Sequence, residues 1–178
     1  MWLVVRNPFP FGEELTETYF ACAPPHGRTR VVATAGSFAQ CASSVTFKTA
    51  GSLLLTREFG GCSVGWSETL ILHDLRHERT TEIIAYSGAN FGLTQVPGSL
   101  QPLGAPFGLS AGEFALNANG DVAWAGSSAP GEVRQRVLYV RDTAGTRRVA
   151  AAPDLSHIAF SGGELTWKAA HAMHAVPA

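Results

Sequence analysis

The chain has 178 residues and a formal net charge of −1, and 46% of its residues are apolar. This length suits one domain of ordinary size, and the apolar fraction is too high for a disordered chain. The near-neutral charge gives no electrostatic footprint for DNA, RNA or an anionic membrane surface, so we expect no nucleic-acid partner.

Targeting and membrane segments are not expected from this sequence. It contains no run of about 18 apolar residues, which a membrane-spanning helix requires. The opening stretch, MWLVVRNPFPFGEE, has no basic region before its short apolar run, and Pro8 and Pro10 interrupt it, so it does not read as a signal peptide. The protein is therefore either cytosolic or separated from a leader that is removed or lies upstream.

In chain order, the expected elements are short β-strands joined by turns. The first group has strands at 2–6, 18–24 and 28–35. Residues 44–85 contain four strands, residues 86–112 form a long insertion, and residues 113–151 contain four more. Residues 157–177 contain a final three. No window carries strong helix formers at helical spacing, so the sequence predicts an all-β chain.

Three of the expected hairpins share one pattern around a glycine. The stretches NANGDVAWAG and SGGELTWKAA place Gly120 and Gly163 before an acidic residue and then alternating apolar positions that end in Trp. SVTFKTAGSLLLTRE matches them, with Gly51 at the turn. Alternation is the period of a strand, and the recurrence of the same apolar spacing around three glycines indicates internal repeats.

A second hairpin follows the first in each full group. ETLILHDLRHERTTEIIA parallels RVLYVRDTAGTRRVAAA, and Asp74 and Asp142 hold the same place at the start of the turn. An Asp in this place can bond its own backbone. Two hairpins make a four-stranded unit, with strands A to D.

Repeated four-stranded units are typical of β-propeller blades, whereas a β-sandwich or open meander is the alternative architecture. Through GDVAWAG, RVLYVRDTAGTRRVA and SHIAFSGGELTWK, the chain resembles the repeat-bearing bacterial β-propellers with WD40-like or TolB-like blades. The resemblance implies a structural pattern, not a catalytic one. We therefore expect a single β-propeller-like domain over 1–178 with about three and a half four-stranded antiparallel blades. Their boundaries are a partial blade at 1–35, a blade at 44–85, the insertion at 86–112, a blade at 113–151 and a partial blade at 157–178.

An incomplete set of blades has to be closed in some way. We expect first that the chain is part of a larger propeller; pairing with a second copy and closure as a small four-bladed ring are the alternatives. Trp124 and Trp167 are expected to pack in the core.

Propeller geometry assigns the loops to two faces, and all the long ones fall on the B–C and D–A face. These include 7–17, 34–44, 59–68, 127–135 and the insertion. Cys41 and Cys62 belong to this face and to one blade, so we favour a disulfide between them, with Cys22 a small buried thiol in a strand. The bond favours an extracellular or cell-envelope location, and reduced thiols in a cytosolic protein are the alternative.

Aromatic residues on the same face are the candidate ligand-binding set. The predicted site residues are Phe59, Trp66, Phe91 and Phe107. Loop aromatics can anchor a partner, although packing beneath the insertion as a satellite core is the alternative that we favour.

Catalytic and metal chemistry find little support in the sequence. His171 and His174 form an H-x-x-H pattern without further ligands, GCSVG lies in an expected strand-to-strand loop, and no nucleotide-binding motif is present. We predict no catalytic residues, no metal site and no cofactor. The expected function is a non-catalytic binding or scaffold module for a protein or glycan. The alternative is a propeller-hosted hydrolase or lyase whose acids come from the loop carboxylates Glu13, Glu14, Glu17, Glu68 and Glu132.

Overall fold

The computed structural model describes residues 3–8, 15–23, 28–38, 41–62, 65–89, 114–127 and 136–178. These residues form antiparallel strands joined by turns, so the all-β prediction is confirmed. Within this part of the chain, no helix has the length and apolar character needed to cross a membrane. The chain divides into two compact units, Met1–Leu103 and Gly104–Ala178.

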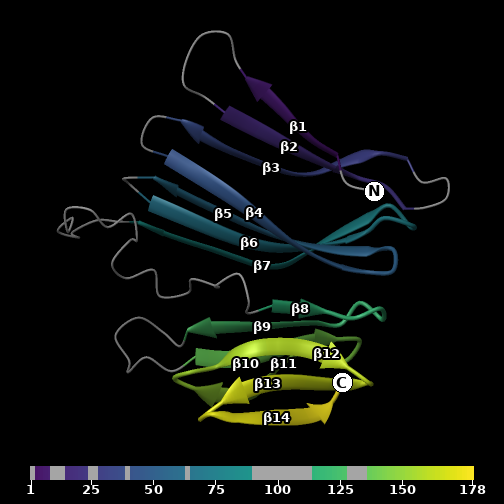
Figure 1. Cartoon of the computed structure of the whole chain (residues 1–178), viewed down its shortest axis with the longest axis vertical. Coiled ribbons are helices and arrows are strands. Elements are labelled where there is room, and N and C mark those ends of the chain that lie inside the picture. The colour runs from purple at the N-terminus through teal and green to yellow at the C-terminus, as the bar shows by residue number, and fades with distance from the viewer. Residues whose placement is uncertain are drawn as a thin grey trace. The chain divides into compact units, whose positions relative to one another are not determined.

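The first unit is a seven-stranded antiparallel meander in the order β1 to β7 (Figure 1). Its strands are β1 (Leu3–Pro8), β2 (Leu15–Ala21), β3 (Arg30–Phe38), β4 (Cys41–Ala50), β5 (Leu53–Cys62), β6 (Gly65–Asp74) and β7 (Arg79–Ala89). The sheet does not close, because β1 and β7 are both edge strands.

Two of the predicted long loops are strands instead. β3 runs to Phe38 and β4 begins at Cys41, so most of 34–44 is paired, and the pairs Ser37–Ala42 and Phe38–Cys41 join β3 to β4. Likewise β5 runs to Cys62 and β6 begins at Gly65, which leaves only residues 63–64 between them. The small residues in both stretches resemble loop composition, but side chains of that size also fit a paired strand end. The predicted insertion begins later than expected, because β7 reaches Ala89, and residues 90–113 lie outside the described part.

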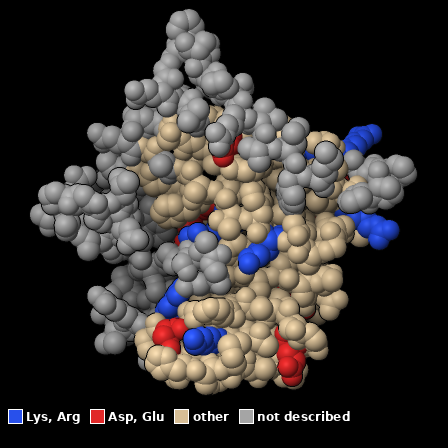
Figure 2. All heavy atoms as spheres, viewed as in Figure 1, with Lys and Arg blue, Asp and Glu red and all other residues tan. Residues whose placement is uncertain are grey.

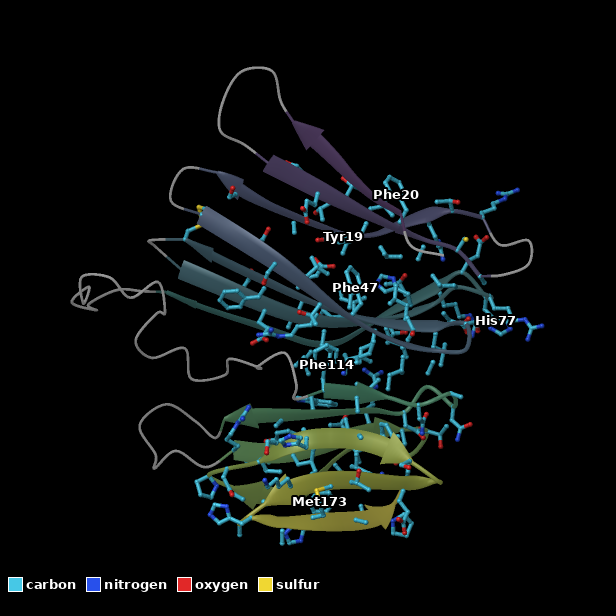
Figure 3. All side chains as sticks on the ribbon, in the orientation of Figure 1. Tyr19, Phe20, Phe47, His77, Phe114 and Met173 are labelled. Carbon is cyan, nitrogen blue, oxygen red and sulfur yellow. A yellow bond between two sulfur atoms is a disulfide. The ribbon has the colours of Figure 1, made fainter. Side chains whose placement is uncertain are left out.

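In the first unit, side chains of β2 and β3 pack against the face of β4 and β5. Ala21 of β2 and Val32 of β3 form a buried cluster with Leu54 of β5. The rings of Tyr19 and Phe47, from β2 and β4, lie 4.9 Å apart between centroids with their planes tilted by 56°, and both residues are labelled in Figure 3. In a flat sheet, a strand and its second neighbour are about 9 to 10 Å apart, which is too far for this ring contact. β3 and β4 are paired only at Ser37–Ala42 and Phe38–Cys41. Beyond these two pairs, β2 and β3 therefore fold over the face of β4 and β5.

The second unit consists of two sheets that share a core. One has the order β11-β10-β9-β8 and the other β12-β13-β14. The strands are β8 (Phe114–Leu116), β9 (Val122–Ser127), β10 (Arg136–Asp142), β11 (Gly145–Ala152), β12 (Ser156–Ser161), β13 (Glu164–Ala169) and β14 (Ala172–Pro177).

Small side chains of one sheet and large side chains of the other form that core. Ala123 and Ala125 of β9 are fully buried beside Leu165 and Trp167 of β13. Small residues on one sheet leave room for the indole of the other, which is how facing sheets reach dense packing. Trp124 and Trp167 are 2% and 6% exposed, so both belong to the buried interior as predicted.

The turns follow the predicted chemistry. Gly51, Gly120 and Gly163 have φ of 61°, 90° and 82°, a backbone conformation that glycine adopts without strain. Asp74 Oδ1 accepts the backbone N–H groups of residues 76 and 77, and Asp142 Oδ1 accepts the N–H of residue 144. The assignment of these residues to turns is therefore confirmed.

Candidate functional site

A polar cluster lies on the face of β5 and β6 that β2 and β3 cover. Leu54 pairs with His73, and Thr56 pairs with Ile71, so alternation puts all four side chains on one face. Leu54 packs with Ala21 and Val32 of the covering strands. The imidazole and the hydroxyl are therefore held inside an apolar layer, with His73 only 6% exposed and Thr56 fully buried.

Both nitrogens of His73 have hydroxyl partners. Nε2 lies 3.2 Å from Thr56 Oγ1, and Nδ1 lies 3.3 Å from Thr80 Oγ1 on β7. Thr56 Oγ1 is also 3.4 Å from the carbonyl oxygen of Ile71, to which it can donate. These contacts fix the orientation of a buried ring whose polar atoms would otherwise be unpaired.

Burial is the main cause of a lowered pKa at His73, and the positive charge of Arg30 lowers it further. Arg30 begins β3 and pairs with Ala21, the residue that packs on Leu54. Its Nη1 atom is buried and has no hydrogen-bond partner. His73 is therefore a neutral imidazole at pH 7, and Arg30 forms no ion pair with a carboxylate in the part of the chain that the structure describes.

The hydroxyl–imidazole contact resembles a nucleophile and its base, but the surroundings do not suit that chemistry. A catalytic triad needs an acid on the second imidazole nitrogen, and here that nitrogen faces Thr80. Thr56 is also out of reach of a substrate, because none of its surface is exposed. The cluster is suited to holding structure or binding a group at its edge, and not to acyl transfer.

The opposite face of the same strands holds a buried ion pair. Arg57 Nε of β5 donates to Glu68 Oε1 of β6, and Glu68 is fully buried. The Arg57 guanidinium also lies 5.9 Å from the centre of the Phe59 ring, which is within range for a cation–π contact.

These positions correct the expectation of loop carboxylates. Glu68 lies in β6, not in a loop, and its carboxylate is bound to Arg57. Glu17 lies in β2 and accepts a hydrogen bond of 2.6 Å from the Tyr19 hydroxyl. The other three members, Glu13, Glu14 and Glu132, lie outside the described residues.

The four predicted ligand-binding aromatics do not form a loop cluster in the described part of the chain. Phe59 lies in β5 and Trp66 in β6, so both are strand residues, contrary to the prediction of loops. The Phe59 ring covers Gly61, with ring carbons 3.6 and 3.7 Å from the position a Cβ would take there. Phe91 and Phe107 lie outside the described residues, and ligand binding by any of the four stays a prediction.

The predicted cysteine pair is present. The register that places Ala42 opposite Gly61 puts Cys41 opposite Cys62, and the two are joined as a disulfide with Cα atoms 4.1 Å apart. Cys22 is a free thiol, as predicted, but it lies just after β2 and is half-buried.

The histidines near the end of the chain have structural contacts. His174 stacks on Trp167 with centroids 5.5 Å apart, and its Nε2 donates to the carbonyl oxygen of Ala169 at 3.2 Å. His171 occupies the turn between β13 and β14. Among the described residues, no three His, Cys, Asp or Glu side chains are grouped so that they could hold a metal ion.

β14 presents an open edge beyond β13. The backbone N–H of Ala178 donates to Gly163 at 2.9 Å, so antiparallel alternation turns the backbone groups of His174 and Val176 toward β13. The N–H and C=O groups of Met173 and Ala175 consequently point outward. No described strand lies on that side, and Met173 is 63% exposed (Figure 3).

Other sheet edges carry protection that β14 lacks. Charged residues such as Arg79 and Glu82 lie in β7, and Arg147 and Arg148 lie in β11. β12 has an irregular register and packs against β8 and β9. β14 has the sequence AMHAVP, with no charged residue and an unbroken register. Charges and bulges are the usual means of blocking an edge, and only Pro177 serves that purpose here.

The charge distribution on the visible face agrees with the sequence composition. Figure 2 shows Lys, Arg, Asp and Glu scattered among the described residues, without a continuous basic surface.

Comparison of the chain with protein-family models, curated proteins and solved structures finds no match.

Proposed function

We propose that this chain is a non-catalytic binding module that joins to a protein partner by adding a β-strand at the edge of β14. The single observation that carries the proposal is the open, uncharged edge at Met173 and Ala175. A strand edge binds another extended backbone through main-chain hydrogen bonds, so its natural partner is a protein and not a glycan.

The occupant that fits this edge is β14 of a second copy. In an antiparallel pair centred on His174, Met173 of each copy lies opposite Ala175 of the other. The outward N–H and C=O groups of both residues then exchange four hydrogen bonds across a two-fold axis. Because β14 is uncharged, the pairing places no Asp, Glu, Lys or Arg side chains of like sign opposite each other, and it covers the exposed Met173.

The propeller-like interpretation belongs to the same proposal and is supported by a shared irregularity. β6–β7 and β10–β11 each have four regular pairs after the turn and then a bulge, at Leu70/Ile71 and Leu138/Tyr139. β2–β3 has a bulge at Tyr19/Phe20. The unpaired residue on the bulged strand is Ile83, Val149 or Val32, a β-branched residue in each case. A β-bulge is a specific structural feature and not a random defect. Its recurrence at corresponding places in three hairpins therefore favours repeated four-stranded units like those of WD40-like and TolB-like blades.

In those units, β14 occupies the place of the third strand. β6 and β10, which hold that place in the other units, both pair with a fourth strand on their far side. The edge of β14 therefore has the geometry that accepts a strand elsewhere in the same chain. An extracellular or envelope location is proposed as well, and the Cys41–Cys62 disulfide supports it.

Two of the five carboxylates on which the hydrolase or lyase alternative depends are not in loops. Glu68 is buried in an ion pair and Glu17 bonds to Tyr19, so neither is a loop carboxylate facing a substrate.

Sedimentation velocity of the full chain across a range of concentrations tests the proposal. The edge is small compared with stable interfaces, so we expect a weak dimer that forms as concentration rises. Met173→Lys places a charge on the edge and should leave a monomer. Val31→Lys is the matched control, because Val31 is 55% exposed in an interior strand and its replacement should leave the dimer intact.

A wild-type chain that stays monomeric at the highest concentration would overturn self-pairing. Equal dimerisation of wild type and Met173→Lys would show that copies associate elsewhere, and would also overturn it. Ala175→Pro provides a second variant, because proline removes an outward N–H and leaves the bonds to β13 in place.

A further inference from the structure

Arg30 in the first unit is a partly buried cation that has no counter-ion among the described residues. Arg30 Nη1 is buried without a hydrogen-bond partner, and no ion pair joins Arg30 to a carboxylate among the described residues. An unpaired buried guanidinium N–H is costly, and such groups are rare in native proteins unless water or an ion completes them. This N–H donor is therefore able to bind a further acceptor.

The surroundings of Arg30 are built from two layers. Arg30 pairs with Ala21, which packs on Leu54, and Leu54 lies opposite His73. Arg30 thus approaches the Thr56–His73–Thr80 cluster from the covering strands. Its charge reaches the imidazole, whose pKa it lowers.

Uncharged donors predominate on the other side of the cluster. Thr56, Thr80 and the imidazole contribute hydroxyl and ring N–H groups. On β5 and β7, the carboxyl groups that share this face by register are Glu58, two residues beyond Thr56, and Glu82, two residues beyond Thr80. On the covering strand β2, Glu17 accepts the Tyr19 hydroxyl. Burial raises the pKa of Glu58, which weakens it as a counter-ion. Thr80 is solvent-exposed, so the cluster is open on the side of β7.

We infer that Arg30, together with Thr80 at the exposed side of the cluster, binds a small oxyanion group: a carboxylate, a phosphate or a sulfate. The planar guanidinium donates in the geometry that these groups accept, and charge-assisted hydrogen bonds are the strong ones. A bound anion would accept a hydrogen bond from Arg30 Nη1 and neutralise the charge of the guanidinium. The site lies in the first unit, whereas β14 lies in the second, so the test of anion binding and the test of strand addition at β14 can give independent results.

The binding can be read from the titration of His73 by NMR in the full chain. Sodium sulfate, sodium phosphate and sodium acetate are each compared with sodium chloride at equal ionic strength. An anion that neutralises Arg30 removes a repulsion on the protonated imidazole, so the pKa of His73 should rise in the oxyanion that binds. By linkage, that anion should bind more tightly as the pH falls through the pKa of His73. A response to acetate alone identifies a carboxylate site, and a response to sulfate and phosphate identifies a tetrahedral one.

Two charge variants separate this site from general salt effects. In Arg30→Gln the pKa of His73 should rise in chloride and then stop responding to the oxyanions. Arg28→Gln removes an exposed charge two residues away and should keep the wild-type response. Thr80→Val removes the hydroxyl that His73 Nδ1 contacts, so the pKa of His73 in this variant is first measured in chloride, and the further shift that the oxyanions cause should be several-fold smaller than in wild type.

Two results would overturn the inference. One is a His73 titration that is the same in all four salts, which would make water the partner of Arg30. The other is an oxyanion response of equal size in wild type and Arg30→Gln, which would place the anion elsewhere.

Discussion

Removing the Cys41–Cys62 disulfide should destabilise the first unit by about 3 kcal/mol. The bond closes a loop of 21 residues, and the chain-entropy relation for a loop of that length gives about 3 kcal/mol at 25 °C. It also lies where β4 joins both β3 and β5, next to the two residue pairs that connect the halves of the seven-stranded sheet. Urea denaturation of the oxidised chain and of a Cys41→Ala/Cys62→Ala variant measures the difference.

Cys22→Ala is the matched control, because Cys22 is a free thiol in the same unit. It should shift the urea midpoint much less than the double variant. A double variant as stable as the oxidised chain would refute the reasoning, since the disulfide would then contribute no constraint on the unfolded state.

Three further changes test the packing and the turns. Glu68→Gln leaves the Arg57 guanidinium without its carboxylate and should cost about 3 to 5 kcal/mol in chemical denaturation, and an apolar pair at both positions should restore most of it. His171→Gly should stabilise the chain by about 1 kcal/mol in the same assay, because His171 has φ of 64° and a side chain there is strained. Asp154 accepts the backbone N–H of Ala170, which is the main cause of its lowered pKa, so its stabilising contribution is present above the ordinary value of 3.8 and is lost as the pH falls through the folded value. Thermal unfolding between pH 5 and 2 should therefore be less pH-dependent in Asp154→Asn, and equal slopes would contradict this.

The strands and turns of this chain were predictable because local chemistry specifies them. Gly51 and Gly163 are at turns that need positive φ, and Asp74 caps its own turn, so each signal is contained within a few residues. The disulfide was predicted on a different basis, because the repeat assigned both cysteines to loops on one face of one blade; the structure places them instead at the ends of the adjacent strands β4 and β5.

The strand ends at Cys41 and Cys62 were harder to predict. Glycine and serine are poor strand formers, so 34–44 and 59–68 resemble loops when taken alone. Cross-strand pairing of these stretches overrides that propensity, and pairing partners are not visible in a single segment. The same limit explains why Phe59 and Trp66 were predicted to lie in loops.

The polar cluster was missed because its members come from three separate strands. Thr56 and His73 do share a short sequence signal: each lies two positions after an apolar residue on the same face of its strand, Leu54 and Ile71. A polar residue at such a position predicts a buried hydrogen-bonded group. Arg30 gives no such signal, since its proximity to His73 depends on how β2 and β3 fold over the sheet.

Residue-resolved hydrogen exchange of β14 at low and high protein concentration most directly tests the claim that this edge takes a second strand. The amides of His174 and Val176 face β13 and should be protected at both concentrations. Those of Met173 and Ala175 should exchange quickly in dilute solution and slow markedly in concentrated solution. Fast exchange at these two amides whatever the concentration would contradict the proposal.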